Sequence, residues 1–348
     1  MSADPGTTIS FASAFGEIAS PAGPTPAGVS AAFSAILSGA WTPVQVAGFV
    51  VSLRLRGETA EIIAAAAQAM RRAMLPVEHG LPATLDTCGT GGDGMGTLNV
   101  STAAAIVVAS LGIAVAKHGN RAVSSRAGSA EVLEQLGIPL DLSPERQAAV
   151  LREAGIAFLF APAHHPAMKH AAVARRELGI RTIFNVLGPL ANPARATHQL
   201  LGTYDDALRP VMAATLRELG TRRAWVVRGE DGLDEVSPST ATHVTELSDG
   251  QLCERVVVPE DFGIPRSPPE ALRGGDAADN ARVIQAILQG NEHPARSAIV
   301  LNAAAALLVA RGGSPVEAAE QAGAAIASGR AQATLERWRA AARTAKGS

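Results

Sequence analysis

Short apolar runs rich in β-branched residues alternate with alanine-rich segments after residue 82, and this alternation limits the possible folds more than any other feature of the chain. Three such runs, at residues 113–116, 156–161 and 224–227, predict strands. The second run is apolar throughout, as expected for a strand covered on both faces. The segments between them predict helices at about 101–111, 129–136, 144–154 and 206–219. Strands that alternate with helices predict an α/β fold around a mostly parallel sheet.

The last third of the chain adds a different local pattern. Apolar runs at residues 244–247 and 252–258 flank Ser248-Asp249-Gly250-Gln251, which predicts an antiparallel hairpin. Helices are then expected at about 278–289, 297–311 and 315–340.

The region before residue 83 shows helix signals and no strand signals. Thr42-Pro43-Val44-Gln45 predicts a helix start, because Thr42 can cap the helix, Pro43 suits its first position and Gln45 can close a capping box. We therefore expect a mobile N-terminal tail over residues 1–27, a small all-helical domain over residues 28–82, and a larger α/β domain from residue 83.

Composition and charge exclude several classes of protein. Hydrophobic residues make up 47% of the 348 residues, which is enough for a sizeable core, while a formal net charge of −2 gives no basic surplus for nucleic-acid binding. No window of about 18 uninterrupted apolar residues predicts a membrane span. Two distant cysteines, Cys88 and Cys253, form neither a disulfide framework nor a zinc site, so we expect a reduced, cytoplasmic setting.

A glycine-rich segment carries the clearest chemical signal. Residues 89–97 read GTGGDGMGT, and Asn99-Val100-Ser101-Thr102 then opens an alanine-rich helix. Glycines let the backbone approach a ligand closely, and the N–H groups of a loop and a helix N-terminus attract anions. The segment therefore predicts a phosphate or diphosphate site, with a simple surface turn as the alternative.

The same glycines also match the spacing of a dinucleotide-binding fingerprint, but the surrounding residues do not fit. That fingerprint requires an acidic residue about 20 positions later to hold a ribose hydroxyl. Residues 98–119 contain no Asp or Glu, and no Lys directly follows the loop as a Walker motif requires.

A second polar segment, Lys117-His118-Gly119-Asn120-Arg121-Ala122-Val123-Ser124-Ser125, follows a predicted strand and is expected to be a loop. The carboxyl ends of parallel strands meet at one edge of the sheet, where open α/β sheets bind ligands. Lys117, Arg121 and the serines offer donors for an anion there, together with Ser129 at the next helix start. An ordinary polar loop with helix caps is the alternative.

Two further groups of charged residues can be read either as parts of a site or as ordinary surface features. Asp234 and Glu235 follow the strand at 224–227, and Mg²⁺ suits a site with few carboxylates plus substrate phosphates. An acidic turn is the alternative. Arg175 lies on a predicted helix and is suited to binding a carboxylate, with a solvated basic helix face as the alternative.

The combination of motifs resembles the anthranilate phosphoribosyltransferase family. The resemblance covers nearly all of the chain after about residue 28. It rests on residues 89–93, 99–102, 117–121, 128–130, 181–185, 188–190 and 234–235.

The resemblance implies a fold, an activity and an assembly. The fold is a small helical domain, completed by a later segment at about 165–196, beside an α/β domain made of residues 83–164 and 197–348. The activity is transfer of the phosphoribosyl group of 5-phosphoribosyl 1-diphosphate (PRPP) to the amine of anthranilate, with release of diphosphate, in tryptophan biosynthesis. The family usually forms homodimers, and it acts on small molecules without nucleic acid or membrane.

The resemblance also assigns residues, although it names no general base. PRPP would be bound by Gly89, Gly92, Asp93, Thr97, Asn99, Val100, Ser101, Thr102, Lys117, His118, Gly119, Asn120, Arg121, Ala122, Val123, Ser124, Ser125 and Ser129. Anthranilate would be held by Gly89, His118, Asn120 and Arg175. Two Mg²⁺ ions would be served by Ser101, Asp234 and Glu235.

Two positions depart from the family pattern: Glu131 stands where Asp is usual, and no proline precedes Arg175 by two residues. Two other functions of the same architecture stay open at this point. A pyrimidine nucleoside phosphorylase would use phosphate and a nucleoside, but it would carry a lysine shortly before the glycines. A nucleic-acid-binding relative would require a basic groove.

Overall fold

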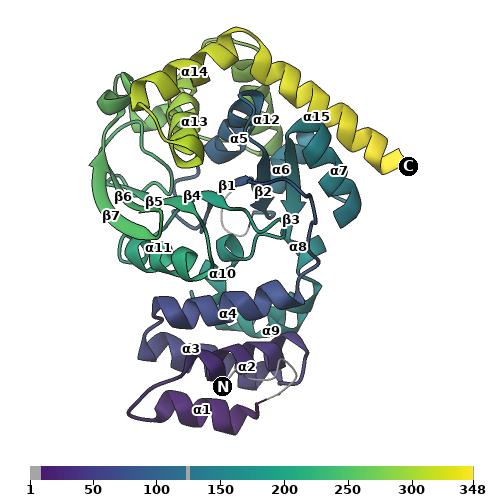
Figure 1. Ribbon diagram of the computed structural model, residues 1–348, viewed down its shortest axis with the longest axis vertical. Helices are drawn as coiled ribbons and strands as arrows, with labels where there is room; N and C mark the ends of the chain where they lie inside the picture. Colours follow the sequence, from purple (N-terminus) through teal and green to yellow (C-terminus); the bar gives the residue numbers. More distant parts are fainter. Residues whose placement is uncertain (1–8, 123–125, 348) are drawn as a thin grey trace.

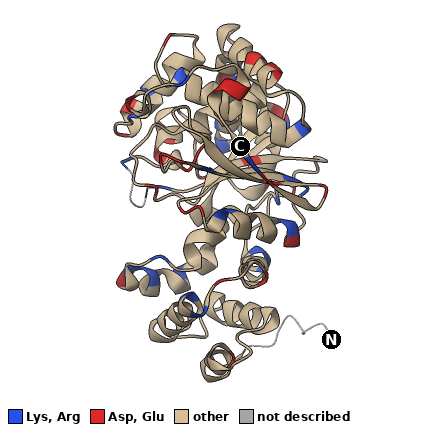
Figure 2. Cartoon of the chain, turned by 90° about the vertical axis from the view of Figure 1, so that its left-hand side faces the viewer, with Lys and Arg blue, Asp and Glu red and all other residues tan. Residues whose placement is uncertain are grey.

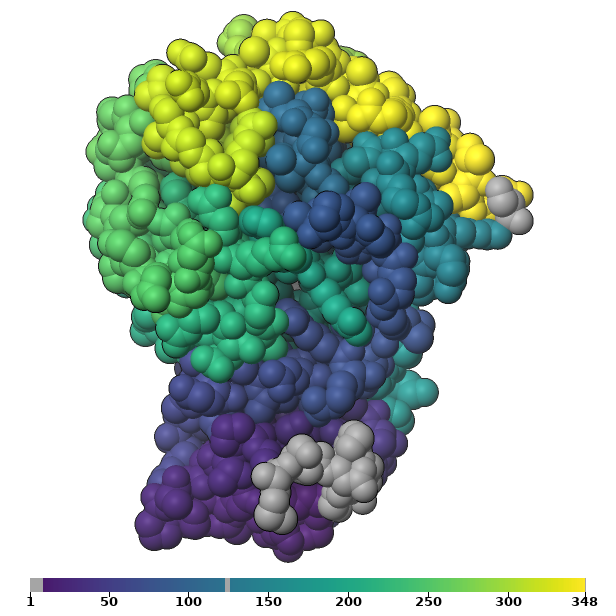
Figure 3. Space-filling view, in the orientation of Figure 1, coloured from purple at the N-terminus to yellow at the C-terminus, as the bar shows by residue number. Residues whose placement is uncertain are grey.

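A computed structural model describes residues 9–122 and 126–347 of the chain. Figure 1 shows a bundle of helices at one end and a twisted sheet with helices on both faces at the other. The same two parts appear in Figure 3 as a narrower lower lobe and a broader upper lobe. Helix α1 lies at the far end of the bundle, and α15 lies across the opposite end of the molecule.

The bundle is built mainly from the N-terminal helices. They are α1 (Phe11–Ala19), α2 (Pro26–Leu37), α3 (Pro43–Arg56) and α4 (Ala60–Ala73). The predicted helix start at Thr42 is confirmed, because Thr42 and Gln45 exchange both hydrogen bonds of a capping box. Two later helices join the bundle: α9 (Lys169–Leu178) packs against α2 and α3, and α10 (Phe184–Leu190) packs against α4.

Helix α1 contradicts the expectation of a mobile tail for residues 9–27. Ser10 caps the helix, and Ala14 and Ile18 are buried on its inner face. The ring of Phe11 packs edge-on against Trp41, with ring centroids 5.6 Å apart. The apolar residues in this segment recur at helical spacing and form a face that the bundle covers. Residues 1–8 lie outside the described part of the chain.

The α/β prediction is confirmed by a seven-stranded sheet with the order β3-β2-β1-β4-β5-β6-β7. Its strands are β1 (Leu85–Gly89), β2 (Val115–Gly119), β3 (Ile156–Phe160), β4 (His198–Gly202), β5 (Arg223–Gly229), β6 (Thr242–Ser248) and β7 (Gln251–Val257). The first five strands run parallel, and β6 and β7 form the predicted antiparallel hairpin. The strand order reverses between β1 and β4, which is where ligands bind in open α/β sheets.

Helices cover the two faces of the sheet in separate groups. On one face α5 (Val100–Ser110) and α13 (Arg296–Arg311) pack against each other and against β1 and β4, and on the other face α11 (Leu208–Glu218) packs against α4, β5 and β6 (Figure 1). The remaining α-helices are α6 (Ser129–Gln135), α7 (Pro144–Ala154), α8 (Ala161–His164), α12 (Ala277–Leu288), α14 (Pro315–Ala327) and α15 (Arg330–Gly347). Three short 3-10 turns complete the described chain: η1 (Pro166–Met168), η2 (Pro259–Phe262) and η3 (Pro269–Leu272).

Three details of the predicted elements are wrong. Lys117, His118 and Gly119 belong to strand β2 and not to the loop after it. The helix expected over residues 315–340 is two helices, because the chain turns at Gly329 with a φ of +76°. Strands β1 and β4 gave no strand signal in the sequence.

Three segments connect the bundle with the sheet, and hydrogen bonds tie them to one another. The segment after α4 donates from the N–H of Leu75 to the carbonyl of His164 over 2.8 Å. Two residues later, the N–H of Val77 donates to the carbonyl of Pro193 over 3.0 Å. The imidazole Nδ1 of His164 also lies 2.8 Å from the carbonyl of Leu75. The three crossings therefore form one hydrogen-bonded unit.

Charged residues and apolar helices are distributed as follows over the described residues. Figure 2 shows acidic and basic residues interspersed over both parts of the molecule. Within the described residues, no single helix is long and apolar enough to cross a membrane. Among these helices, only α13 and α14 reach that threshold as a pair, and they are bent by 120°, with most of α13 buried.

Candidate functional site

The glycine-rich loop begins where β1 ends, at the point where the strand order reverses. Gly91, Gly92, Gly94 and Gly96 have φ values from 61° to 78°. Side chains other than glycine rarely adopt this left-handed backbone conformation, so the loop depends on these four residues. The prediction of a tight glycine loop at the carboxyl edge of the sheet is confirmed.

Contacts from neighbouring strands hold the loop in place. The N–H of Thr90 donates to the carbonyl of Gly202 at the end of β4, and its hydroxyl accepts from the N–H of Tyr204. Arg181 donates to the carbonyl of Gly92 while its guanidinium lies 3.7 Å from the centroid of the Tyr204 ring. Arg181, which the sequence did not single out as a contact residue, thus connects the loop with the segment between α9 and α10.

Two glycines make room for the acidic pair after β5. A Cβ on Gly89 would lie 2.4 Å from Oδ2 of Asp234, and a Cβ on Gly202 would lie 1.6 Å from the carbonyl oxygen of the same residue. The N–H of Gly91 donates to Asp234 Oδ2 over 3.2 Å. The glycine loop and Asp234 are therefore in direct contact.

The acidic pair is half-buried, and the pKa values of both carboxyl groups are raised. Burial, reinforced by the charge of Asp93, raises the pKa of Asp234 to about 7. Burial, reinforced by the charge of Asp234, raises the pKa of Glu235 to about 8. Oδ2 of Asp93 is buried and accepts no hydrogen bond from the described residues. Two carboxylates as close as Asp234 and Glu235 repel one another unless a cation lies between or beside them.

Helix α5 begins beside these carboxylates. The N–H of Ser101 donates to Oε1 of Glu235 over 3.1 Å. The side chains of Val100 and Thr102 are buried in the core, so only their backbone atoms face the start of the helix. The amide of Asn99 donates to the carbonyl of Ala127 and accepts from Asn280, a buried residue of α12 that the sequence did not single out.

Lys117 is the buried cation nearest to this group. Its ammonium donates to the carbonyl of Thr87 and, over 3.2 Å, to the hydroxyl of Ser101. Burial lowers the pKa of Lys117, and the carboxylates around it raise that pKa. Because Lys117 lies in β2, its ammonium group reaches the start of α5.

The segment after β2 is anchored at both ends by one carboxylate. Glu131 accepts from the N–H groups of Ala122, over 3.2 Å, and Gly128, over 3.1 Å. Arg121 forms an ion pair with Glu134 and lies over the ring of Phe160. Asn120 and Ser129 meet at the other side of the segment, where the Ser129 hydroxyl lies 3.4 Å from the Asn120 carbonyl. Val123, Ser124 and Ser125 fall outside the described residues.

Thr97 lies at the end of the glycine-rich segment and connects it to the segment after η3. It forms an isolated antiparallel bridge with Arg273, and a Cβ on Gly274 would lie 2.7 Å from the Thr97 carbonyl group. The segment after η3 therefore packs closely along the end of the loop.

Two histidine rings lie side by side next to the end of β2. The rings of His118 and His165 have centroids 5.2 Å apart, and Nδ1 of His118 lies 3.0 Å from the carbonyl of Gly188. Burial holds the pKa of His118 well below its usual range and lowers that of His165 to about 4. Both rings are therefore uncharged at neutral pH. His165 is not among the residues that were predicted to bind a ligand.

Arg175 lies on α9 with its guanidinium 5.6 Å from the centroid of the Phe184 ring. No carboxylate within the described ranges forms an ion pair with this guanidinium. An exposed arginine without an acidic partner, held over an aromatic ring, is available to a carboxylate ligand.

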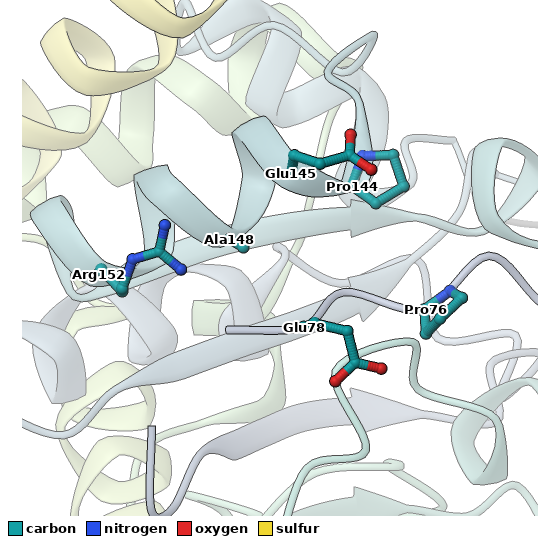
Figure 4. A pocket seen from close by; sticks show the side chains of 6 residues that line it. All are labelled: Pro76, Glu78, Pro144, Glu145, Ala148 and Arg152. Atoms are coloured by element: carbon teal, nitrogen blue, oxygen red, sulfur yellow. The ribbon is translucent and has the colours of Figure 1, made fainter. Parts of the chain in front are cut away.

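Figure 4 shows a surface pocket that is separate from these residues. It has a volume of about 170 Å³ and lies between α7 and the first crossing segment, lined by Pro76, Glu78, Pro144, Glu145, Ala148 and Arg152. None of the residues predicted to bind a ligand lines it.

Comparison with known proteins identifies the family. A profile described as "Glycosyl transferase family, a/b domain" matches residues 81–332, and one described as "Glycosyl transferase family, helical bundle domain" matches residues 23–74. An anthranilate phosphoribosyltransferase of Symbiobacterium thermophilum is 51% identical over 316 residues, which cover 90% of this chain and 93% of the relative. The chain belongs to the anthranilate phosphoribosyltransferase family. The family named from the sequence motifs is confirmed, and neither alternative function is favoured.

Other members of the anthranilate phosphoribosyltransferase family extend the match to the full length and to three dimensions. One from Rhodopseudomonas palustris strain BisA53 is 47% identical over 339 residues, covering 97% of this chain and 100% of the relative. The crystal structure from Thermus thermophilus matches with a TM-score of 0.87 at 44% identity, covering 92% of this chain and 96% of that one. The Saccharomyces cerevisiae enzyme in complex with PRPP and Mg matches with a TM-score of 0.88 at 30% identity, covering 96% and 99%.

Proposed function

We propose that this chain transfers the phosphoribosyl group of PRPP to the amine of anthranilate and releases diphosphate, as a step of tryptophan biosynthesis. The observation that carries the proposal is the contact between the glycine loop and a half-buried acidic pair at the point where the strand order reverses. This arrangement provides N–H donors for phosphate and carboxylates for a metal ion in one place. Membership of the family supplies the identity of the two substrates.

Mg²⁺ is the cofactor that the donor set fits. Within residues 9–122 and 126–347, no three His, Cys, Asp or Glu side chains converge as a closed metal site. Mg²⁺ is usually bound by one or two carboxylates while substrate phosphates and water complete its shell. The raised pKa values of Asp234 and Glu235 and the unpartnered Oδ2 of Asp93 fit carboxylates that face a cation. We propose that two Mg²⁺ ions bind to Asp234 and Glu235, with Ser101 as a further ligand. We add Asp93 to this set of ligands.

PRPP would lie along the glycine loop and the start of α5. Gly89, Gly92, Asp93 and Thr97 would contact it from the loop, and residues 99–102 from the helix. Residues 117–125 and Ser129 would bind from the second segment, where Lys117 is the nearest buried positive charge. Arg121 would have to exchange its ion pair with Glu134 for a phosphate.

Anthranilate would be held beside the end of β2. Arg175 would bind its carboxylate, since this guanidinium has an aromatic support but no acidic partner in the described chain. His118, Asn120 and Gly89 would surround the ring and the amine. The uncharged state of His118 and His165 suits this role, because no positive charge then opposes the sugar as it becomes cationic.

Departure of diphosphate leaves an oxocarbenium-like sugar, and the site must stabilise negative charge on the leaving group. Bound Mg²⁺ supplies part of that charge stabilisation. Lys117 and the N–H groups of the glycine loop supply the rest from fixed positions. The aromatic amine is unprotonated at neutral pH, so it needs correct placement and no strong general base.

We also propose a cytoplasmic homodimer. Val44 and Leu55, both on α3, are 81% and 85% exposed, and Phe15 on α1 is 43% exposed. Large apolar side chains gathered on one part of the bundle fit a protein interface. Both cysteines are unpaired, as expected in a reducing compartment.

The test is a complete reaction with purified protein, Mg²⁺, PRPP and anthranilate, followed by the loss of anthranilate fluorescence. Loss that requires all three added components is the expected result. If diphosphate is released only with another aromatic acid or base, the acceptor is wrong. If no diphosphate is released under any condition, the transferase function is wrong.

A further inference from the structure

Asp86 is a completely buried carboxylate that cannot touch a ligand, yet it lies directly beneath the candidate site. It belongs to β1, and its exposed fraction is 0%. Oδ1 accepts from the backbone N–H of His118 over 3.1 Å. Oδ2 accepts from the amide of Asn192 over 2.8 Å. A buried carboxylate carries a large desolvation cost, so its presence in the core requires a specific role.

Asn192 fixes the orientation of this carboxylate. Its Nδ2 also donates to the carbonyl of Ala116 over 2.8 Å, and its Oδ1 accepts from the N–H of Ala194 over 2.8 Å. With both ends of its amide in use, Asn192 cannot flip without losing hydrogen bonds. Asn192 lies in the third crossing segment, so its hydrogen bond holds Asp86 from the bundle side of the sheet. The hydrogen bond from His118 holds Asp86 from β2.

Asp86 and Lys117 are interlocked across two neighbouring strands. The carboxylate on β1 binds the backbone of His118, the residue after Lys117, and the ammonium on β2 binds the backbone of Thr87, the residue after Asp86. Lys117 is only 2% exposed, so its positive charge depends on nearby carboxylates.

The proposed function assigns Asp234 and Glu235 to Mg²⁺, which leaves Asp86 as the buried carboxylate whose strand interlocks with that of Lys117. We propose that Asp86 is a positioning residue that anchors Lys117 for the diphosphate of PRPP and, through the N–H of His118, fixes the neighbouring acceptor residue. This inference rests on the proposed function. It adds two buried residues beneath the site, Asp86 and Asn192, to the residues that the family motifs name.

The first test is Asp86→Asn, which keeps the size of the side chain and an oxygen for the His118 N–H but removes the charge and the oxygen that accepts from Asn192. The expected result is a loss of about tenfold in kcat/KM for PRPP, which corresponds to about 1.4 kcal/mol. The KM for anthranilate should change by less than about twofold, because His118 keeps its anchor. Thr215→Val is the matched control, because it removes a buried hydroxyl from α11, away from the site.

A double-mutant cycle with Lys117→Met decides whether Asp86 acts through Lys117. The measured quantity is the affinity for PRPP with Mg²⁺, by calorimetry, in the four proteins of the cycle. Asp86→Asn should weaken binding about tenfold when Lys117 is present and less than about twofold when it is Met. Equal losses in both backgrounds, or no loss in either, would overturn the inference.

The cycle remains informative if Asp86→Asn alone does not fold. The double variant replaces a buried charge pair with neutral side chains of similar size, which proteins often tolerate. If it binds PRPP about as well as Lys117→Met alone, Asp86 acts only through Lys117, and a further tenfold loss would contradict that. Failure of the wild-type protein to bind PRPP would instead contradict the proposed function.

Discussion

The backbone N–H of Ser101 donates a hydrogen bond of 3.1 Å to Oε1 of Glu235, although 134 residues separate the two in the chain. This contact joins the first turn of α5 to the loop after β5. A metal ion held by Glu235 would therefore lie beside the N-terminus of a helix that also attracts phosphate. Because of this contact, the glycine loop, the N-terminus of α5 and the acidic pair form one site.

Glu235→Gln should separate activity from stability. Glutamine keeps the shape of the side chain and the oxygen that accepts from Ser101, but it removes the charge that a metal ion requires. Turnover at saturating Mg²⁺ should fall at least about 100-fold. The thermal midpoint should hold or rise, because a neutral amide is easier to bury than a carboxylate. Glu230→Gln, an exposed residue paired with His243, is the control, and unchanged turnover in Glu235→Gln would refute the metal assignment.

Gly89→Ala should disable the site through a single methyl group. A Cβ at this position would lie 2.4 Å from Asp234 Oδ2, so the carboxylate must move away from the glycine loop. A fall of about 100-fold in kcat/KM is expected, because small displacements of reacting groups carry losses of this size. Gly16→Ala on α1 is the matched control, since nothing lies within 4 Å of its added Cβ. Equal activity of the two variants would show that Asp234 can shift without consequence.

Arg175→Ala should affect one substrate only. Loss of the guanidinium removes the proposed partner of the anthranilate carboxylate, so the KM for anthranilate should rise at least about tenfold. The KM for PRPP should stay within about twofold of its original value. Arg176→Ala on the same helix is the control, because it removes the same charge one residue away. Similar effects of both variants would indicate a general electrostatic role and not a specific contact.

His165 should make the protein less stable in mild acid. Burial lowers its pKa to about 4 in the folded protein, whereas an exposed histidine has a pKa of about 6.5. The unfolded chain then binds more protons between these values. The free energy of unfolding should be constant with respect to this group above pH 6.5 and fall as the pH drops towards 4. The expected loss from this group at pH 5 is about 2 kcal/mol.

Urea unfolding at pH 7.5 and pH 5.0 measures this effect. In His165→Gln the difference in unfolding free energy between the two pH values should be smaller by about 2 kcal/mol, because glutamine does not titrate. His293→Gln is a suitable control, because it replaces a histidine near the start of α13, away from the site. Equal pH dependence in wild type and His165→Gln would contradict the assignment.

The sequence predicted those parts of the fold where local signals agree with tertiary structure. The capping box at Thr42 and the hairpin around Asp249 depend on neighbouring residues, so they could be predicted without the rest of the chain. The glycine loop was recognised because so many glycines in so few residues are rarely found outside tight, ligand-facing turns. The helix α1 was missed because Ser, Gly and Pro near its ends obscured a short apolar face.

Strands β1 and β4 were missed for a reason connected with function. Asp86 and Thr87 in β1 and Gln199 in β4 are buried polar residues, and they interrupt the apolar pattern that marks a central strand. Gln199 donates to the carbonyl of Pro189, and Asp86 binds Asn192. Asn192 lies far from Asp86 in the sequence, so only the assembled structure shows why such residues occur in the middle of the sheet.

The three hydrogen-bonded crossings between bundle and sheet have a mechanical consequence. Separate connections would let the bundle slide or twist against the sheet with little resistance. Because the bonds of Leu75 and Val77 link all three, sliding one crossing strains the other two. Bending about the line of the crossings would leave those bonds intact, so we expect it to be easier than sliding. Such bending would bring Arg175 on the bundle and Lys117 on the sheet closer together or move them apart.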